Sequence, residues 1–266
     1  MGKYIVIDIG GSGARIGEVT EFGVAAVQRE FINSKEELIQ VIKSRFSHID
    51  GIAVSVTGLV HAGTGCVINS DSASYLEGNL KETLCKAFPD SRIYVVNDGE
   101  AHALALLNIP HVKLGAINLA IGTSIVLGVL NERGEPVRTV SGENWEIGHL
   151  LLTTRMSNPV AKLTFKPYVY WALGENGIEK LKQSMGEKSY KHFGFLLGAF
   201  STQLAILFRP KTIGFSGGYI SRYWHKIEES FNKEFRPSAS FMTTPEIIAQ
   251  KDTESALIGL SLLFKL

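Results

Sequence analysis

Apolar residues in the first part of the chain form short runs that stop at glycines. The run Tyr4–Ile9 is rich in β-branched residues and ends at Gly10–Gly13. Alternation at a period of two resumes over Ala14–Val19, and a third run covers Val24–Phe31. Because a helix would show apolar residues three and four positions apart, this pattern predicts three successive strands joined by tight turns.

Helical patterns alternate with strand patterns after this point. Ser34 followed by Glu37 is a capping-box pattern, which predicts the start of a helix. Further elements are expected as a strand over Ile49–Val60, a helix over Asn79–Phe88, a strand over Arg92–Val96 and a helix over Glu100–Leu107.

The pattern restarts after Pro110. A strand is predicted over Ile117–Ile121, a turn at Gly122–Ser124 and a return strand over Ile125–Leu130. The remaining elements are expected as helices over Pro159–Met185, Tyr190–Phe208, Ser221–Phe235 and Asp252–Phe264, with one strand over Thr212–Phe215. Two units that each begin with strand, glycine turn and strand favour an internally duplicated chain, divided near Asn108–Leu114.

Composition narrows the function without defining it. The 266 residues are 45% hydrophobic with a formal net charge of +1, so charge gives no reason to expect nucleic acid or an anionic membrane as partner. No uninterrupted apolar run approaches 18 residues, so no spanning helix is expected, and no signal segment precedes the first strand pattern. Two cysteines, Cys66 and Cys85, are too few for a zinc cluster and favour a reducing, cytoplasmic location.

Two glycine turns between strands are candidate phosphate loops, because glycines let backbone N–H groups approach an anion. A P-loop or a dinucleotide fingerprint would need a following helix, whereas the first turn leads into a strand. Either turn could equally be an ordinary tight hairpin. The candidate residues are Asp8, Gly10, Gly11, Ser12 and Gly13 in the first turn, and Gly122, Thr123 and Ser124 in the second.

Three other places carry candidate chemistry. Asp98 follows a predicted strand, where a carboxylate could serve as general base for phosphoryl transfer, but it could instead cap the next helix. Glu146 and His149 lie three residues apart and could hold sugar hydroxyls, or could be an ordinary polar surface pair. Gly217 and Gly218 follow a strand and could lie against an adenosine, although a bare Gly-Gly turn is a weak signal.

The order of these elements resembles the ROK family (repressors, open reading frames and sugar kinases) of the sugar kinase, actin and heat-shock ATPase superfamily. The resemblance covers nearly the whole chain and rests on the motifs DIGGSGARIG, VNDGEAHALA, AIGTS, WEIGH and FSGGY. The stretch Val54–Leu80, which includes Asn69, is similar to the sugar-binding segment of the family.

The resemblance implies an α/β fold of two actin-like (ribonuclease H-like) domains that face each other across a nucleotide and sugar cleft. Residues 1–110 would form the sugar and phosphate domain, and residues 111–251 the nucleotide-binding domain. The C-terminal helix, residues 252–266, would pack back on the first domain.

The resemblance also implies residue roles. Asp98 would be the general base, and the sugar would be bound by Asn69, Asn97, Asp98, Glu146 and His149. ATP would be bound by Gly10, Gly11, Ser12, Gly13, Gly122, Thr123, Ser124, Gly217 and Gly218, with Asp8 near magnesium (Mg2+). The implied function is ATP-dependent phosphorylation of a hexose, glucoside or N-acetylhexosamine hydroxyl.

The sequence departs from the family in ways that leave alternatives open. No cysteine lies between Leu150 and Leu173, so no structural zinc is expected. The second loop, Gly122–Val126, has fewer glycines than usual, which would suit a sugar-binding sensor with impaired catalysis, and another ATPase of the superfamily is a third possibility. Repressor members of the family carry a helix-turn-helix before the kinase-like part; because only three residues precede the first strand here, no DNA-binding domain is expected. The apolar run Phe193–Phe208 could form a homodimer surface or belong to the core.

Overall fold

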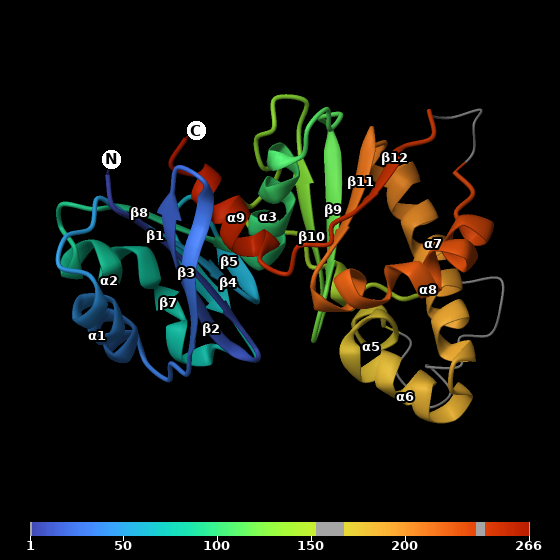
Figure 1. The fold of residues 1–266 in the computed structure, drawn as a ribbon, viewed down its shortest axis with the longest axis horizontal. Coiled ribbons are helices and arrows are strands. Elements are labelled where there is room, and N and C mark those ends of the chain that lie inside the picture. Colours follow the sequence, from blue (N-terminus) through green and yellow to red (C-terminus); the bar gives the residue numbers. More distant parts are fainter. Residues whose placement is uncertain (1, 153–167, 238–242, 266) are drawn as a thin grey trace. The chain divides into compact units, whose positions relative to one another are not determined.

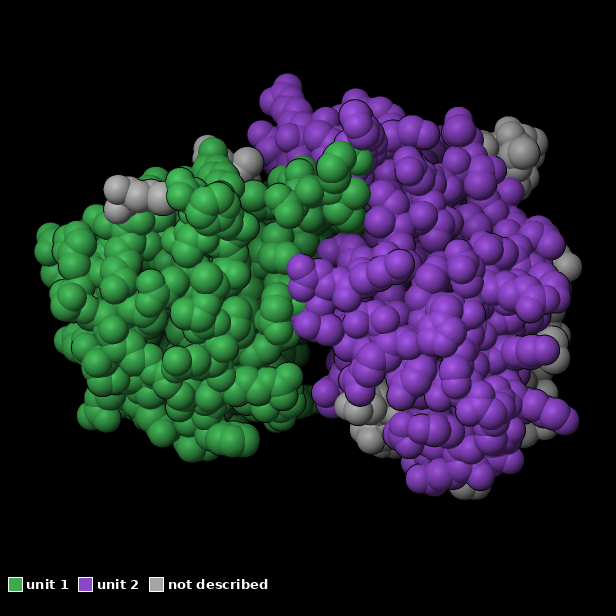
Figure 2. Space-filling view, in the orientation of Figure 1, with its two compact units in different colours: residues 1–110, 136–145, 254–266 green, residues 111–135, 146–253 purple. Residues whose placement is uncertain are grey.

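The computed structural model describes residues 2–152, 168–237 and 243–265. The chain forms two compact units, shown in Figure 2. Unit 1 comprises residues 1–110, 136–145 and 254–266, and unit 2 comprises residues 111–135 and 146–253. The segment 136–145 therefore belongs to unit 1, whereas the sequence assigned it to the second domain. The C-terminal segment is part of unit 1 together with the N-terminal residues.

Unit 1 is built on a five-stranded sheet of order β3-β2-β1-β4-β8. The strands β1 (Tyr4–Gly10), β2 (Gly13–Thr20) and β3 (Gly23–Glu30) form the predicted antiparallel meander. The strands β4 (Gly51–Val56) and β8 (Arg92–Asn97) continue the sheet in parallel with β1. This topology sends the carboxyl ends of β1, β4 and β8 to the same sheet edge.

Helices cover both faces of this sheet (Figure 1). The helices α1 (Lys35–Arg45) and α2 (Leu80–Ala87) pack over a core that includes Ile5, Ile7 and Ile9. The helices α3 (Asp98–Leu104) and α9 (Ser255–Leu262) pack on each other against the opposite face, and a short 3-10 turn (Ala105–Asn108) follows α3. The predicted cap of α1 is present, since Ser34 Oγ accepts a hydrogen bond from the Glu37 N–H at 3.0 Å.

The expected strand Ile49–Val60 is interrupted in the structure. It ends at Val56, turns at Thr57–Gly58, and continues as β5 (Leu59–His61) in a separate sheet. This small sheet also contains β6 (Cys66–Asn69) and β7 (Gly78–Asn79), with a 3-10 turn at Ser74–Leu76 between them. The interruption places a loop where the sequence suggested a continuous strand.

Unit 2 contains a four-stranded sheet of order β10-β9-β11-β12. The predicted pair β9 (Ala116–Ile121) and β10 (Ile125–Leu130) is antiparallel, and β11 (Thr212–Ser216) runs parallel to β9. The edge strand β12 (Glu246–Ala249) was not expected from the sequence.

Four helices of unit 2 lie within the described residues and follow the expected helical regions. They are α5 (Val169–Leu173), α6 (Glu175–Met185), α7 (Lys188–Phe208) and α8 (Gly218–Glu234). The first part of the helix expected from Pro159 lies outside the described residues.

Helix α7 is long and apolar enough to cross a membrane by length and composition, although the sequence led us to expect no such helix. Half of its apolar stretch is buried within the structure, where α7 packs along α8. Phe193 and Phe200 are buried, whereas Ile206 and Leu207 near its end are exposed. A core helix of a globular unit has these properties, so the feature is weak evidence for a membrane. Most of the Phe193–Phe208 run is core.

The contact between α3 and α9 depends on Gly259. A Cβ at this position would lie 1.8 Å from the carbonyl oxygen of Ala101, a backbone atom that cannot move without shifting α3. We expect Gly259→Ala to lower the free energy of unfolding by about 2 kcal/mol or more, as overpacking of a core does. Urea denaturation measures the loss. Gly122→Ala, whose added methyl meets open space, is the control and should change stability little.

Candidate functional site

The carboxyl ends of the parallel strands in unit 1 lie at one level. Ile9 pairs with Val56, and Val56 pairs with Asn97, so Gly10, Thr57 and Asp98 follow one row of the sheet. The Thr57 N–H donates to the Ile9 carbonyl at 3.1 Å, which continues the pairing into the loops. Open α/β sheets bind ligands at this edge, and the sequence-predicted residues of unit 1 gather there.

The Asn97 side chain holds this edge together. The residue is 1% exposed, and its Oδ1 accepts a hydrogen bond from the Gly99 N–H at 2.7 Å, which caps α3. Its Nδ2 donates to the Gly58 carbonyl at 2.8 Å and, more weakly, to the Val56 carbonyl at 3.4 Å. One buried amide therefore joins the end of β4, the turn after it and the start of α3.

Asp98 is the first residue of α3, and the N-cap position is Asn97. The Asp98 side chain is partly exposed, and its Oδ1 lies 3.0 Å from the Gly99 nitrogen, which donates to it. A carboxylate in the first turn is stabilised by the partial positive charge of the helix N-terminus. The sequence left open that Asp98 caps this helix; in the structure the cap is Asn97.

Asn69 belongs to the same group of loops. It ends β6 and pairs with Leu59. Gly58 packs directly on its backbone, since a Cβ at position 58 would lie 2.3 Å from the Asn69 carbonyl oxygen. The side chain of Asn69 is exposed. The structure therefore brings Asn69 close to the turn that Asn97 anchors, although 28 residues separate them in the chain.

The first glycine turn is a tight hairpin. Gly10 pairs with Gly13, and Gly11 and Ser12 form its exposed tip. The chain returns as a strand, so the turn has neither the P-loop nor the dinucleotide geometry. Its exposed backbone is accessible to an anion.

Asp8 lies on β1, two residues before Gly10, and is 9% exposed. Its Oδ2 accepts from Arg15 Nη2 at 2.6 Å and from Arg15 Nε at 3.2 Å, and its Oδ1 accepts from Ser55 Oγ at 2.6 Å. Both carboxylate oxygens are therefore engaged by the protein. Within the part of the chain that the structure describes, no group of three or more His, Cys, Asp or Glu is arranged to hold a metal ion.

The glycine turns of unit 2 also meet at one sheet edge. In the turn after β9 the Gly122 N–H donates to the Ser124 carbonyl at 2.9 Å, and Gly122 and Thr123 are exposed. Gly217, which precedes α8, has φ of 92° and approaches β9 so closely that a Cβ would lie 2.5 Å from the Ile121 oxygen. Only glycine meets both conditions. The second loop, Gly217 and the start of α8 at Gly218 are thus adjacent.

Glu146 directly precedes a 3-10 turn of unit 2, Ile147–His149, and His149 is the last residue of that turn. Both side chains are exposed. A Cβ on Gly148, inside this turn, would lie 3.9 Å from the carbonyl oxygen of Ile125, the first residue of β10. The turn therefore packs beside the second glycine loop, and the predicted residues of unit 2 also form one group.

Several polar residues of unit 1 were missed by sequence reasoning. Arg15 could have been found, because the predicted hairpin pairs it with Asp8. Its second partner, Glu254 at 3.2 Å, is 239 residues away and left no local signal. Glu100, which is 5% exposed, accepts two hydrogen bonds from Arg138 at 2.6 and 3.1 Å. That ion pair attaches the segment 136–145 to the first turn of α3.

His102 is buried between α3 and α9, where its Nδ1 lies 2.7 Å from Ser255 Oγ. Burial is the main cause that lowers the pKa of His102 to about 4; Asp8 opposes the shift, and Arg15 adds a smaller effect in the direction of burial. The imidazole is therefore neutral at pH 7. It packs beside the charged groups under the hairpin without adding charge to them.

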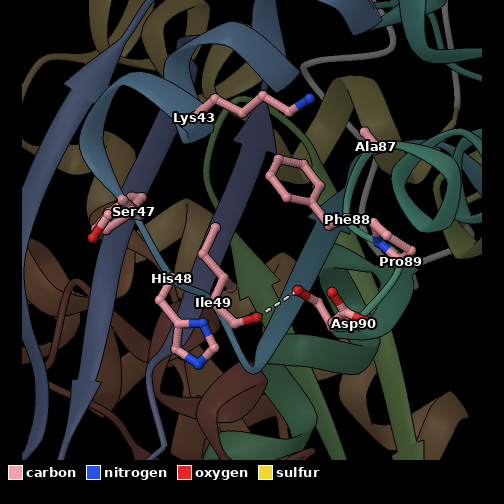
Figure 3. A pocket seen from close by; sticks show the side chains of 10 residues that line it. Lys43, Ser47, His48, Ile49, Ala87, Phe88, Pro89 and Asp90 are labelled. Atoms are coloured by element: carbon pink, nitrogen blue, oxygen red, sulfur yellow. Dashed lines mark hydrogen bonds between the residues drawn. The ribbon is translucent and has the colours of Figure 1, made fainter.

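A pocket of about 330 Å³ lies between the ends of α1 and α2 (Figure 3). Lys43, Phe46, His48, Phe88 and Asp90 are among its lining residues. It is near the amino-terminal ends of β4 and β8, the sheet edge opposite Asp98. The predicted site residues do not line it, so we do not assign the site there.

Comparisons with known proteins find similarity in fold. No protein-family model matches the chain, and neither does any curated protein. A presumed sugar kinase from Cytophaga hutchinsonii superposes over 100% of both chains with a TM-score of 0.78 at 19% identity. A ROK family glucokinase from Streptomyces griseus, solved with glucose and AMPPNP, gives 0.73 at 18% identity over 98% of this chain and 99% of that one.

A ROK family transcriptional regulator, a homologue of the E. coli MLC protein, gives a TM-score of 0.75 at 15% identity. That match covers 97% of this chain and 77% of the regulator. Together these structures confirm the predicted α/β fold of two actin-like domains, which is the fold of ROK sugar kinases. Kinases and a regulator share it, so the fold alone does not choose between them.

His102 makes stability depend on pH. Its folded pKa of about 4 is below the unfolded value of 6.5, so the unfolded chain binds a proton first as the pH falls. We expect its contribution to the free energy of unfolding to be complete above pH 6.5 and to fall by up to about 3 kcal/mol towards pH 4. Urea denaturation of wild type and His102→Gln across this range checks it: the variant should lose less stability on acidification. His225→Gln, at an exposed position, should follow wild type.

Proposed function

We propose that this chain is an ATP-dependent sugar kinase of the ROK family. It would transfer the γ-phosphate to a hydroxyl of a hexose, glucoside or N-acetylhexosamine in the cytoplasm. The observation that supports this best is the position of Asp98, a partly exposed carboxylate at the carboxyl end of β8 whose neighbour Asn97 supplies the helix cap. Open α/β sheets bind ligands at this edge, and a carboxylate within reach of the attacking hydroxyl can act as its general base.

In this proposal Asp98 accepts the proton of the sugar hydroxyl as the oxygen attacks phosphorus. Phosphoryl transfer relies on alignment and charge stabilisation, so the groups that fix the sugar matter as much as the base. Asn69, Glu146 and His149 have exposed side chains that can bind hydroxyls. The amide of Asn97 is already occupied by protein partners, so we assign it the role of positioning Asp98.

The nucleotide would be bound by glycine turns. The turns at Gly10–Gly13 and Gly122–Ser124 expose backbone that can donate to phosphates, and Gly217–Gly218 opens the 17-residue helix α8. Magnesium, which accompanies ATP, would neutralise charge on the β- and γ-phosphates. Asp8 is the residue that the family resemblance offers as its ligand, but its oxygens are engaged by Arg15 and Ser55, so no step is assigned to a metal on Asp8.

A sugar-binding sensor is the second candidate. It is favoured by the similarity in fold to a transcriptional regulator and by the small number of glycines in the loop Gly122–Ser124. Such a protein would bind a small-molecule sugar through the same side chains without turnover.

Asp98→Asn is expected to retain the fold and to reduce sugar phosphorylation by about 10²- to 10⁴-fold, the usual contribution of a positioned base. A coupled assay of sugar-dependent ADP formation measures the rate. Asp90→Asn, which neutralises an exposed aspartate at the sheet edge opposite Asp98, should retain the wild-type rate. An Asp98→Asn enzyme as fast as wild type would contradict the assignment of the base.

The kinase and the sensor differ in what a ligand stabilises. For the kinase we expect both the sugar and an ATP analogue to raise the melting temperature, because the two ligands occupy different loops. Thermal unfolding with each ligand alone measures this. Stabilisation by sugar only, with no ADP formed, would favour the sensor.

A further inference from the structure

We infer that Arg15 is the permanent counter-ion of Asp8, so that Asp8 anchors the phosphate hairpin and does not bind a divalent metal directly. Asp8 lies where a family resemblance implies a magnesium ligand. The groups around it in this chain point to a different role, because Arg15 compensates its charge and both carboxylate oxygens already accept hydrogen bonds.

The contacts of Asp8 account for its carboxylate. Arg15 approaches Oδ2 through two guanidinium nitrogens, at 2.6 and 3.2 Å, and Ser55, which is fully buried, donates to Oδ1 at 2.6 Å. Guanidinium and carboxylate pair strongly when two N–H groups point at the acid, and Arg remains charged at any pH at which the protein is folded. Oδ2 accepts two of these bonds and Oδ1 one, so a directly bound metal would have to share Oδ1 with the Ser55 hydroxyl or displace Arg15 from Oδ2.

The same guanidinium also pairs with a second acid. Arg15 Nη1 lies 3.2 Å from Glu254 Oε2, and Glu254 directly precedes α9. The side chain of Arg15 is 20% exposed, so the cation is only partly screened by water. A divalent ion placed on Asp8 would be repelled by this cation at short range. Mg2+ also dehydrates reluctantly and requires near-octahedral ligands, which two engaged oxygens do not provide.

Arg15 therefore has a structural consequence for the hairpin. It lies on β2, two residues after Gly13, and connects the hairpin to the residue that precedes α9. Asp8 and Arg15 face each other across the same strand pair that carries Gly10–Gly13. The pair keeps the two arms of the phosphate hairpin in register and attached to the C-terminal segment. Its relevance to phosphoryl transfer rests on the proposed kinase function, but its electrostatic role does not.

The test measures manganese binding to the protein in the absence of nucleotide and sugar, with the EPR signal of free Mn2+ as the readout. We expect wild type and Asp8→Asn to bind Mn2+ equally weakly, because Asp8 contributes no ligand. Arg15→Gln removes the shared cation from Asp8 and Glu254, and we expect it to bind Mn2+ at least tenfold more tightly than wild type. This gain should disappear in the double variant Arg15→Gln/Asp8→Asn.

Two controls separate charge from general disturbance. Arg15→Lys keeps a cation at the site and should bind as weakly as wild type. Arg45 on α1 forms a comparable partly buried ion pair with Glu30 on β3. Arg45→Gln breaks this pair and should create no metal site. Circular dichroism checks folding. If Arg15→Gln does not fold, comparing the Mn2+ affinity of wild type with that of Asp8→Asn still tests whether Asp8 is a metal ligand.

Tighter Mn2+ binding by wild type than by Asp8→Asn, by tenfold or more, would overturn the inference. A folded Arg15→Gln protein with no gain in affinity would overturn it too. Because the assay contains no substrate, a failure of the kinase proposal would leave these results readable, and the two hypotheses can fail separately.

Discussion

The amide side chain of Asn97 is the constraint on which the candidate site of unit 1 depends. It is buried at the end of β8, and it bonds at once to the start of α3 and to the turn after β4. Replacing this amide is costly, because the backbone groups that it bonds would remain buried without a hydrogen-bond partner. Its position leaves the next residue, Asp98, in the first helical turn with the helix dipole behind it, while the Gly58 turn brings Asn69 to the same edge.

The charges around this edge are organised by arginines from neighbouring segments. Arg15 neutralises Asp8 and pairs with Glu254, and Arg138 neutralises the buried Glu100. Removing one member of such a pair is expected to destabilise, because an uncompensated charge would then be buried. The Glu100–Arg138 pair has a second effect. It attaches the segment 136–145, which returns from unit 2 and leads back to it, to the helix that carries Asp98.

The sequence predicted those features that depend on local pattern. The strand meander, the Ser34 cap and the glycine turns follow from periodicity and turn chemistry, and the order of motifs indicated the fold. Features that depend on distant partners could not be predicted. The edge strand β12 is four residues long and is defined by pairing with β11, and Glu254 meets Arg15 across 239 residues. The helix cap could not be predicted either. Asn and Asp are equally suited to an N-cap, so only the backbone conformation shows that Asn97, and not Asp98, occupies it.

The most direct test of the account is to incubate the protein with ATP, magnesium and a panel of hexoses, glucosides and N-acetylhexosamines, and to follow phosphorus by ³¹P NMR. The account predicts a new phosphomonoester resonance with at least one sugar, formed together with ADP and absent when the sugar is omitted. Release of inorganic phosphate alone, or ATP left intact with every sugar of the panel, would contradict a sugar kinase that uses Asp98 as its base.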